Sequence, residues 1–214
     1  NNMEIIKKPW FNSLEPAEIL DAFGDIQPQP IACCNWGSDY PYAPTASFRM
    51  FHNGEYLFVR YDVAEDCTAA RVAEDNGEVW TDSCVEFFIS TDDKGYYNFE
   101  ANCIGKLLLG FRCKDKEPAM APKSVLDSVK RFSSLPCSVF DERHDAQPWW
   151  LIIAIPASAL FMHKFHSWDG IKAKANVYKC GDNLSNPHFL SWNPIHHPTP
   201  NFHLPEFFGT LELE

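Results

Sequence analysis

The sequence has no long apolar run and little positive charge. Its longest apolar segment, around residues 149–155, has the length of a strand and falls well short of the roughly 18 residues that cross a bilayer. Eighteen lysines and arginines stand against 29 acidic residues, which gives a formal net charge of −11, and the basic residues are scattered. A phosphate backbone would be repelled by this charge. The composition therefore excludes a membrane-spanning protein and disfavours a nucleic-acid-binding one.

Cysteine is sparse, and an apolar leader is missing. Among the eight cysteines, Cys84 and Cys103 lie inside strand-like runs, where a cysteine behaves as a small buried hydrophobe, so we expect reduced thiols. After Met3 the segment contains Lys7-Lys8-Pro9 instead of the seven or more consecutive apolar residues of a signal peptide. If Met3 is the initiator, we expect a cytoplasmic protein. If a signal peptide has been removed, we expect a secreted or periplasmic one.

Helical patterning is confined to one short segment. A capping residue at Ser13, a first-turn Pro16 and a stop at Gly24 predict a short helix there. Elsewhere side chains alternate with a period of two, which is typical of strands. The strands predicted in this way cover residues 55–63, 83–91, 96–103, 106–113, 149–155, 171–178 and 208–214.

Turn signals and the lack of any compositional break indicate how these strands are assembled. Asn53-Gly54 and Ile104-Gly105 are typical of tight turns between neighbouring strands. We therefore predict a single domain over residues 1–214, an all-β, two-sheet antiparallel β-sandwich of jelly-roll or immunoglobulin-like type with one or two short helices. Two long connections, 113–136 and 180–205, interrupt it, and connections of this length usually carry function or cover a site.

Two neighbouring strands combine an apolar face with a polar one. The side chains expected to face the core are Val85, Phe87, Ile89, Tyr97 and Phe99. The opposite face carries Glu86 and Glu100, which a hairpin through residues 92–95 would place directly across from each other. Like charges in such positions are destabilising unless a cation, a raised carboxyl pKa or an arginine compensates them. Arg60 faces away from the apolar side of its own strand, so it is the arginine we expect there.

This polar face is open to three interpretations. The simplest is a solvated outer face with an arginine–carboxylate network. A second is a ligand-binding face, because carboxylates and amides match sugar hydroxyls, which both donate and accept hydrogen bonds. A third is a retaining glycosidase, whose two carboxyl groups lie about 5 Å apart, although pairing across a hairpin gives such a spacing by itself. Trp80, at the start of the polar-faced strand, favours ligand binding, since aromatic rings bind the apolar faces of sugars.

Five blocks of sequence carry a resemblance to a known family. They are Leu-Phe-Val-Arg-Tyr-Asp-Val at 57–63, Val-Trp-Thr-Asp-Ser-Cys-Val-Glu-Phe-Phe-Ile at 79–89, Tyr-Tyr-Asn-Phe-Glu-Ala-Asn at 96–102, Ser-Trp at 191–192 and Asn-Phe-His-Leu-Pro-Glu-Phe-Phe-Gly at 201–209. In this order the blocks resemble carbohydrate-binding module family 9 and its stand-alone bacterial relatives, over about residues 45–214. The resemblance implies a non-catalytic β-sandwich that clasps a terminal sugar between two aromatic rings, with structural calcium in several members.

The resemblance also implies roles for individual residues. Trp80 and Phe202 match the two rings of the clasp, and Phe202 stands where the enzyme-linked modules carry a tryptophan. Glu86 and Asn102 match polar positions that bond sugar hydroxyls, whereas Glu100 stands where those modules are expected to carry a basic residue. The predicted partner is a mono- or oligosaccharide, and no catalytic residue is predicted. The predicted ligand-binding set is Trp80, Glu86, Asn102, Phe202, Arg60 and Glu100.

Calcium and a purely structural role complete the set of expectations. Two oxygen-rich segments are candidate calcium ligands, although neither has the spacing of an EF-hand. Their side chains are Asp62, Glu65, Asp66, Glu74, Asp75 and Asn76. A structural calcium is therefore an expectation that rests mainly on the resemblance. The remaining alternative is a structural or protein-interaction module that binds no glycan and contacts a partner through its aromatic loop residues.

Overall fold

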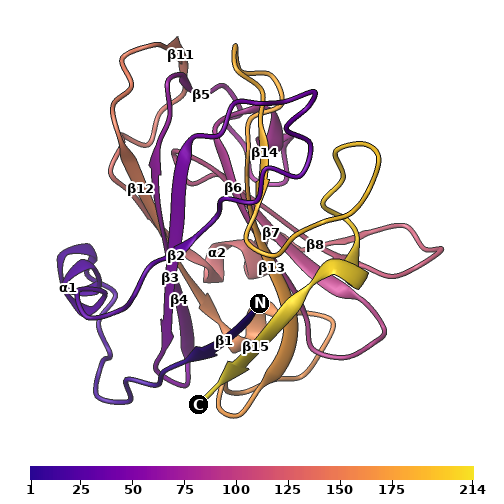
Figure 1. Ribbon diagram of the computed structural model, residues 1–214. Coiled ribbons are helices and arrows are strands. Elements are labelled where there is room, and N and C mark those ends of the chain that lie inside the picture. The colour runs from indigo at the N-terminus through magenta and orange to yellow at the C-terminus, as the bar shows by residue number, and fades with distance from the viewer.

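The computed structural model describes residues 1–214, and two packed β-sheets dominate it (Figure 1). The larger sheet contains, in order, β1 (Asn2–Ile5), β15 (Gly209–Leu213), β13 (Lys172–Cys180), β6 (Cys84–Ser90), β7 (Tyr96–Asn102), β8 (Leu107–Arg112) and β9 (Ala119–Met120), and β14 (Phe189–Ser191) also pairs with β13. The smaller sheet contains β10 (Lys130–Ser133), β12 (Trp149–Pro156), β4 (Tyr56–Ala64), β3 (Thr45–His52) and β2 (Gln29–Pro30). The predicted all-β sandwich is confirmed.

Smaller elements close the ends of the sandwich. A separate two-stranded sheet pairs β5 (Thr68–Ala70) with β11 (Phe140–Arg143). The helices are α1 (Pro16–Ala22) and α2 (Lys123–Ser128), with single 3-10 turns η1 (Val79–Thr81), η2 (Ala157–Ala159) and η3 (Pro205–Phe207). No helix of the structure is long and apolar enough to cross a membrane.

Every strand predicted from alternation is present, with ends that differ by one or two residues. The predicted helix is also present as α1, but Ser13 does not cap it in the expected way: its hydroxyl accepts a hydrogen bond from the Glu15 amide at 3.0 Å, before the helix begins. The sequence analysis missed β3, the long strand that precedes the Asn53-Gly54 turn and forms a hairpin with β4. Gly54 adopts a φ of +94°, which explains why this tight turn needs glycine.

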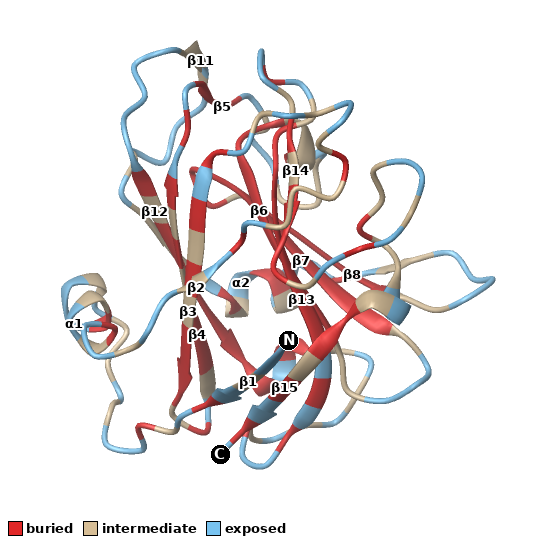
Figure 2. Ribbon diagram, viewed as in Figure 1, coloured by how far each residue is buried: buried red, intermediate tan, exposed pale blue.

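The two large sheets share one apolar core of 40 buried residues. Side chains of β6 and β7 that were predicted to face it, from Val85 to Phe99, belong to this core, so the strand register was assigned correctly. Trp149 is fully buried within it, whereas Trp150 on the opposite face of β12 is half-buried. Figure 2 shows the same alternation of burial along the strands of the smaller sheet.

The outer face of the larger sheet is also covered. A second apolar cluster of 11 buried residues joins outward-facing side chains of β6, β7 and β13, such as Phe88, Tyr96 and Tyr178, to Phe202 in the loop after β14. This long connection, coloured orange to yellow in Figure 1, folds against the sheet. The face that carries Glu86 and Glu100 is therefore not the solvated surface that the simplest interpretation required.

Candidate functional site

A cavity of about 240 Å³ lies on this outer face, between the sheet and the loops that follow β13 and β14. The sheet contributes Glu86 of β6, Glu100 of β7 and Arg112 of β8. The loops contribute aromatic and polar side chains that include Phe202 and His203. Residues more than 100 positions apart in the sequence therefore line one cavity.

The two glutamates form the polar centre of the cavity. They are direct cross-strand partners, as predicted, and both are almost fully buried. The Cys180 thiol lies 3.5 Å from Glu86 Oε2, and the Asn98 amide donates to Glu100 Oε2 at 2.8 Å. Burial, together with the neighbouring Glu100, raises the pKa of Glu86 well above its ordinary value. The shift favours the protonated form of Glu86, which can donate as well as accept a hydrogen bond.

The prediction that Arg60 compensates this pair is wrong. Arg60 lies on β4 of the other sheet, where its guanidinium binds Asp62 with an Nη2 to Oδ1 distance of 3.0 Å. Alternation along a strand shows that a side chain faces outward but not which sheet carries the strand, and this is why the assignment failed. The arginine that lines the cavity is Arg112, and its Nε is buried without a hydrogen-bond partner.

Trp80 and Phe202, the predicted clasp, line the same cavity. Trp80 lies in η1 and is half-buried, and its backbone carbonyl accepts a hydrogen bond from the Asp182 amide at 3.1 Å. Phe202 is only 8% exposed and stacks on Tyr178 with a centroid distance of 4.3 Å and an interplanar angle of 19°. The fold thus brings both rings to one cavity, with Phe202 fixed more tightly than Trp80.

Asn102, also predicted to bind ligand, lies outside the cavity lining. It is fully buried at the end of β7, and its amide donates to Asp82 Oδ2 and to the Val72 carbonyl, both at 3.1 Å. Asp82 in turn accepts hydrogen bonds from the backbone amides of Arg71 and Val72. Asn102 therefore stabilises the loop that leads into η1 and Trp80.

Besides Arg112, the sequence analysis missed the polar side chains of Asp182 and His203 in this site. Asp182 follows β13, and burial, with a contribution from Glu100, raises its pKa to about 6. His203 stacks on Phe88 and forms a 2.8 Å hydrogen bond with the Tyr96 hydroxyl, while burial and the nearby Arg112 lower its pKa to about 4. His203 is therefore neutral at neutral pH.

A signal for one missed residue was present in the sequence. In the β7–β8 ladder Arg112 pairs with Tyr96, Gly110 with Asn98 and Leu108 with Glu100. These pairs are two positions apart, so all of them lie on the same face of the sheet. Extending the register across the Ile104-Gly105 turn would have placed Arg112 on the face of Glu100. No comparable pattern marks Asp182 or His203, because both lie in loops.

The oxygen-rich segments considered for calcium are occupied by internal contacts. Asp62 binds Arg60, Glu65 binds the buried Lys179, and Asp75 binds Arg131 through both carboxylate oxygens at 2.7 and 3.0 Å. These carboxylates already neutralise cations of the protein, so they do not fit a calcium-ligand set in this arrangement. A structural calcium stays a prediction without an assigned position.

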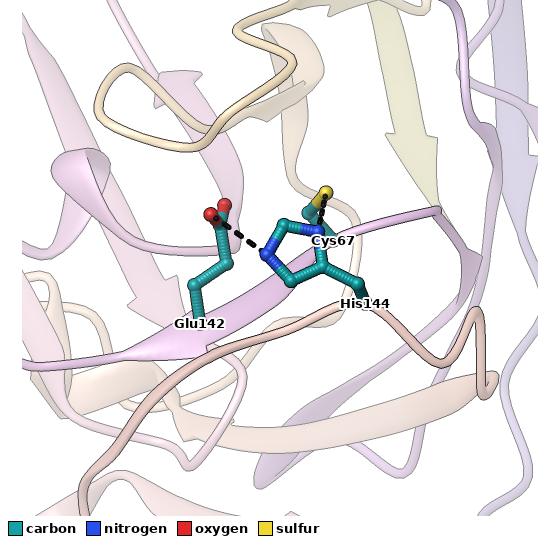
Figure 3. Close-up of side chains that lie close together, drawn as sticks. All are labelled: Cys67, Glu142 and His144. Carbon is teal, nitrogen blue, oxygen red and sulfur yellow. Dashed lines mark hydrogen bonds and ion pairs between the residues drawn. The ribbon is translucent and has the colours of Figure 1, made fainter.

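A separate cluster joins Cys67, Glu142 and His144 at the end of the sandwich (Figure 3). Figure 3 shows the His144 ring between the other two, with Nδ1 3.2 Å from the Cys67 sulfur and Nε2 3.4 Å from a Glu142 oxygen. Glu142 also accepts a hydrogen bond from the Ser185 amide at 2.7 Å. Because the two ring nitrogens face different partners, the three side chains form a chain of contacts that links β11 to neighbouring loops.

The comparisons with known proteins identify a family and related structures. Residues 16–213 match the model of carbohydrate-binding family 9. A crystal structure of a provisionally named carbohydrate-binding protein from Bacteroides uniformis is 44% identical to this chain, with a TM-score of 0.96 over 100% of this chain and 99% of that one. No curated protein matches the sequence.

Two further structures are similar in fold. A carbohydrate-binding module of family 9 from Caldicellulosiruptor kristjanssonii, solved in complex with glucose, has a TM-score of 0.65 and 9% identity, with 100% of this chain and 96% of that one covered. The same module in complex with cellotriose gives the same TM-score and identity, with 94% of that chain covered. At this identity the likeness concerns the fold alone.

Proposed function

Because the chain belongs to carbohydrate-binding family 9, we propose that it binds a saccharide in the cavity between Trp80 and Phe202 and does not catalyse a reaction on it. The observation that carries this proposal is the make-up of the cavity. Aromatic side chains form its walls and carboxyl groups lie at its base, which is the combination that a sugar ring with apolar faces and polar edges requires.

Each group of the cavity has a task in the proposed complex. The half-buried Trp80 and Phe202 would cover the apolar faces of the ring and exclude water. Glu86, whose pKa is raised by burial, would donate a hydrogen bond to a sugar hydroxyl in its protonated form, and Glu100 would accept one. The cavity volume of about 240 Å³ is smaller than that of a typical pocket for a drug-sized ligand. A single terminal sugar would therefore occupy the cavity, and further sugar units would extend outward. The family members solved with glucose and cellotriose support this size class.

The glycosidase alternative shares the same two glutamates and is tested separately. A retaining enzyme needs one carboxyl group as acid and one carboxylate as nucleophile, and Glu86 and Glu100 are adjacent and differently bonded. Under our proposal, aryl glycosides and oligosaccharides incubated with the protein release no sugar. If the wild-type protein released sugar and Glu86→Gln did not, the function would be catalysis and not binding alone.

The binding proposal is tested by removing the more accessible ring of the clasp. A glycan array would identify the best ligand, and calorimetry would then compare wild type with Trp80→Ala. Removal of an aromatic anchor commonly costs about 2 kcal/mol, so we expect affinity to fall by more than tenfold. The thermal midpoint should change little, because Trp80 packs only against the periphery of the outer cluster.

Trp10→Ala is a matched control, since Trp10 is 74% exposed and lies outside the cavity. It should leave affinity unchanged. Equal affinities of wild type and Trp80→Ala, or a collapse of the thermal midpoint in Trp80→Ala, would show that Trp80 is structural. Absence of binding to any glycan would favour the interaction-module alternative.

A further inference from the structure

A second, larger cavity of about 800 Å³ adjoins the candidate site. Its walls come from the β6–β7 turn at residues 92–95, from the loop after β8 at residues 113–118 and from η3. Arg112 and His203 line both cavities. A ligand that extends from the first cavity past these two side chains therefore enters the second one.

This second cavity, here termed the basic groove, is positive in an otherwise acidic protein. Its five cationic side chains are Lys94, Arg112, Lys114, Lys116 and Lys174. Three carboxylates face them, those of Asp92, Asp93 and Glu206, which leaves an excess of two positive charges (5 − 3) against a net charge of −11 for the chain. Asp92 is also bound to His163 at 2.9 Å. A local field of this sign attracts an anion.

The cations of the groove are not used within the protein. None of its four lysines forms an ion pair, and all four are exposed. Arg112 forms no side-chain hydrogen bond, and its Nε is buried without a partner. By contrast, Arg131 donates to both oxygens of Asp75. A guanidinium left without an acceptor at the junction of two cavities is suited to bind a planar anionic group of a ligand.

Two of the three carboxyl groups of the first cavity are shifted toward their uncharged form. Burial beside Glu100 raises the pKa of Glu86 well above its ordinary value, and the pKa of Asp182, raised to about 6, leaves a fraction of that group protonated near neutral pH. Glu100 is the third carboxyl group, and it accepts a hydrogen bond from the Asn98 amide. His203 carries no charge. The base of the first cavity therefore offers hydrogen-bonding groups to hydroxyls, while the positive charge is concentrated at Arg112 and beyond.

We infer that the saccharide bound here is acidic: its ring occupies the first cavity, and its carboxylate or sulfate group is bound by Arg112 and the lysines of the basic groove. The inference rests on the proposed function, because it assumes that a sugar occupies the first cavity. It adds the chemical class of that sugar, which the overall composition of the protein would not suggest.

Three probes that differ at one substituent test the inference. Calorimetry at neutral pH and low ionic strength would compare glucose, glucuronate and glucose 6-sulfate. We expect at least one acid to bind about tenfold more tightly than glucose, as a charge-assisted, bidentate contact provides. Comparison of the two acids distinguishes a carboxylate ligand from a sulfate ligand. The preference should shrink at about 0.15 M salt, because the groove lysines are exposed and screened.

Variants assign the preference to the groove. Arg112→Gln should reduce the ratio of acid to glucose affinity to near one. The fold should survive, because the Arg112 side chain forms no hydrogen bond within the protein and its Nε is buried without a partner. Lys114→Ala combined with Lys116→Ala should reduce the ratio about threefold, an electrostatic effect at exposed positions that cannot arise from misfolding of the core. Lys164→Ala removes the same charge outside the groove and should leave the ratio unchanged.

The outcomes separate the two proposals. Equal affinities for glucose and both acids, or a preference that survives Arg112→Gln, would overturn the acidic-saccharide inference and leave sugar binding intact. Binding of none of the three probes, nor of any glycan on an array, would overturn sugar binding itself and the inference with it.

Discussion

Two buried centres of carboxyl groups lie on opposite faces of the larger sheet, and their charge is compensated in different ways. On the inner face, Glu65 accepts hydrogen bonds from Lys179 Nζ at 3.0 Å and Trp149 Nε1 at 2.8 Å. Lys179 also donates to His188 Nε2 at 2.7 Å, and the pKa of that histidine, lowered to about 2 by burial and by Lys179, keeps it neutral. On the outer face, Glu86 and Glu100 face each other with no cation paired to either.

The difference separates a structural centre from a binding one. The inner charges satisfy one another completely, and all three side chains are fully buried. The outer pair has no cation, so burial and the repulsion between its members raise the pKa of Glu86, and the pair borders a cavity. Polar groups without full internal partners, placed at a cavity, are available to a ligand, whereas fully partnered ones stabilise the fold.

The largest effect is expected from breaking the inner centre. Lys179→Met should lower the free energy of unfolding by about 3–5 kcal/mol, because it leaves Glu65 charged, buried and unpaired. Urea denaturation measures this loss. The free energy of sugar binding, measured on the folded protein, should change far less than the free energy of unfolding.

Two companion variants sharpen the test. Adding Glu65→Gln to Lys179→Met should restore much of the lost stability, since no charge is then left unpaired. Lys172→Met makes the same replacement at an exposed position of the same strand and should change stability by less than about 0.5 kcal/mol. If Lys179→Met lowered the free energy of unfolding no more than Lys172→Met does, the inner ion pair would contribute nothing to stability.

The outer centre should respond next to removal of its aromatic cover. Phe202→Ala should lower the free energy of unfolding by about 3 kcal/mol, because the ring is nearly buried and stacks on Tyr178. It should also weaken sugar binding, in contrast to Trp80→Ala, which is expected to affect binding alone. Thermal denaturation and calorimetry would be carried out on both variants. Equal changes in thermal midpoint and in sugar affinity for Phe202→Ala and Trp80→Ala would contradict the conclusion that Phe202 is held more tightly than Trp80.

Neutralising Glu86 should have a smaller, stabilising effect. Its raised pKa means that the folded state holds the proton more tightly than the unfolded one, so this contribution is present below the unfolded pKa of about 4.3 and is lost as pH rises through the folded value. Glu86→Gln should therefore be more stable than wild type in alkaline solution by about 1 kcal/mol. Denaturation across pH measures this, with the exposed Glu212→Gln as a control without effect.

The smallest effect is expected at Asp182, at the edge of the cavity. Its pKa of about 6 is raised, so wild-type stability should fall as pH rises from about 4 to 6, and Asp182→Asn should remove that part of the slope. Because the side chain is partly exposed, the change should not exceed about 1 kcal/mol. A slope that persists in this variant but disappears in the exposed Asp39→Asn would assign the titration elsewhere.

The strands of the core were predictable because burial on one face imposes alternation. Segments such as β6 and β7 have seven residues each, long enough for the pattern to be recognised, and their hairpin register followed from one turn. The short strands were not predictable. Three residues of β14 pair with β13, and the tertiary contacts of the surrounding loop, more than any local preference, hold them there.

The site was predictable only in part, for the same reason. Glu86, Glu100, Trp80 and Phe202 were identified from alternation and family resemblance, and the fold brings all four to one cavity. Arg60 was assigned to the wrong sheet, since an alternating pattern does not specify which strands pair across long sequence distances. Loop residues such as Asp182 have no periodicity to reveal their direction.

The stacking of Phe202 on Tyr178 also bears on the thermodynamics of binding. The Phe202 carbonyl accepts a hydrogen bond from the Tyr178 hydroxyl at 3.2 Å, so both the backbone and the ring of this residue are immobilised before any ligand arrives. A pre-organised wall spares the complex the conformational entropy of ordering that side chain, which is about 0.5–1.5 kcal/mol for a mobile one. Affinity in this cavity would then be limited mainly by the displacement of water and by the single, less constrained ring of Trp80.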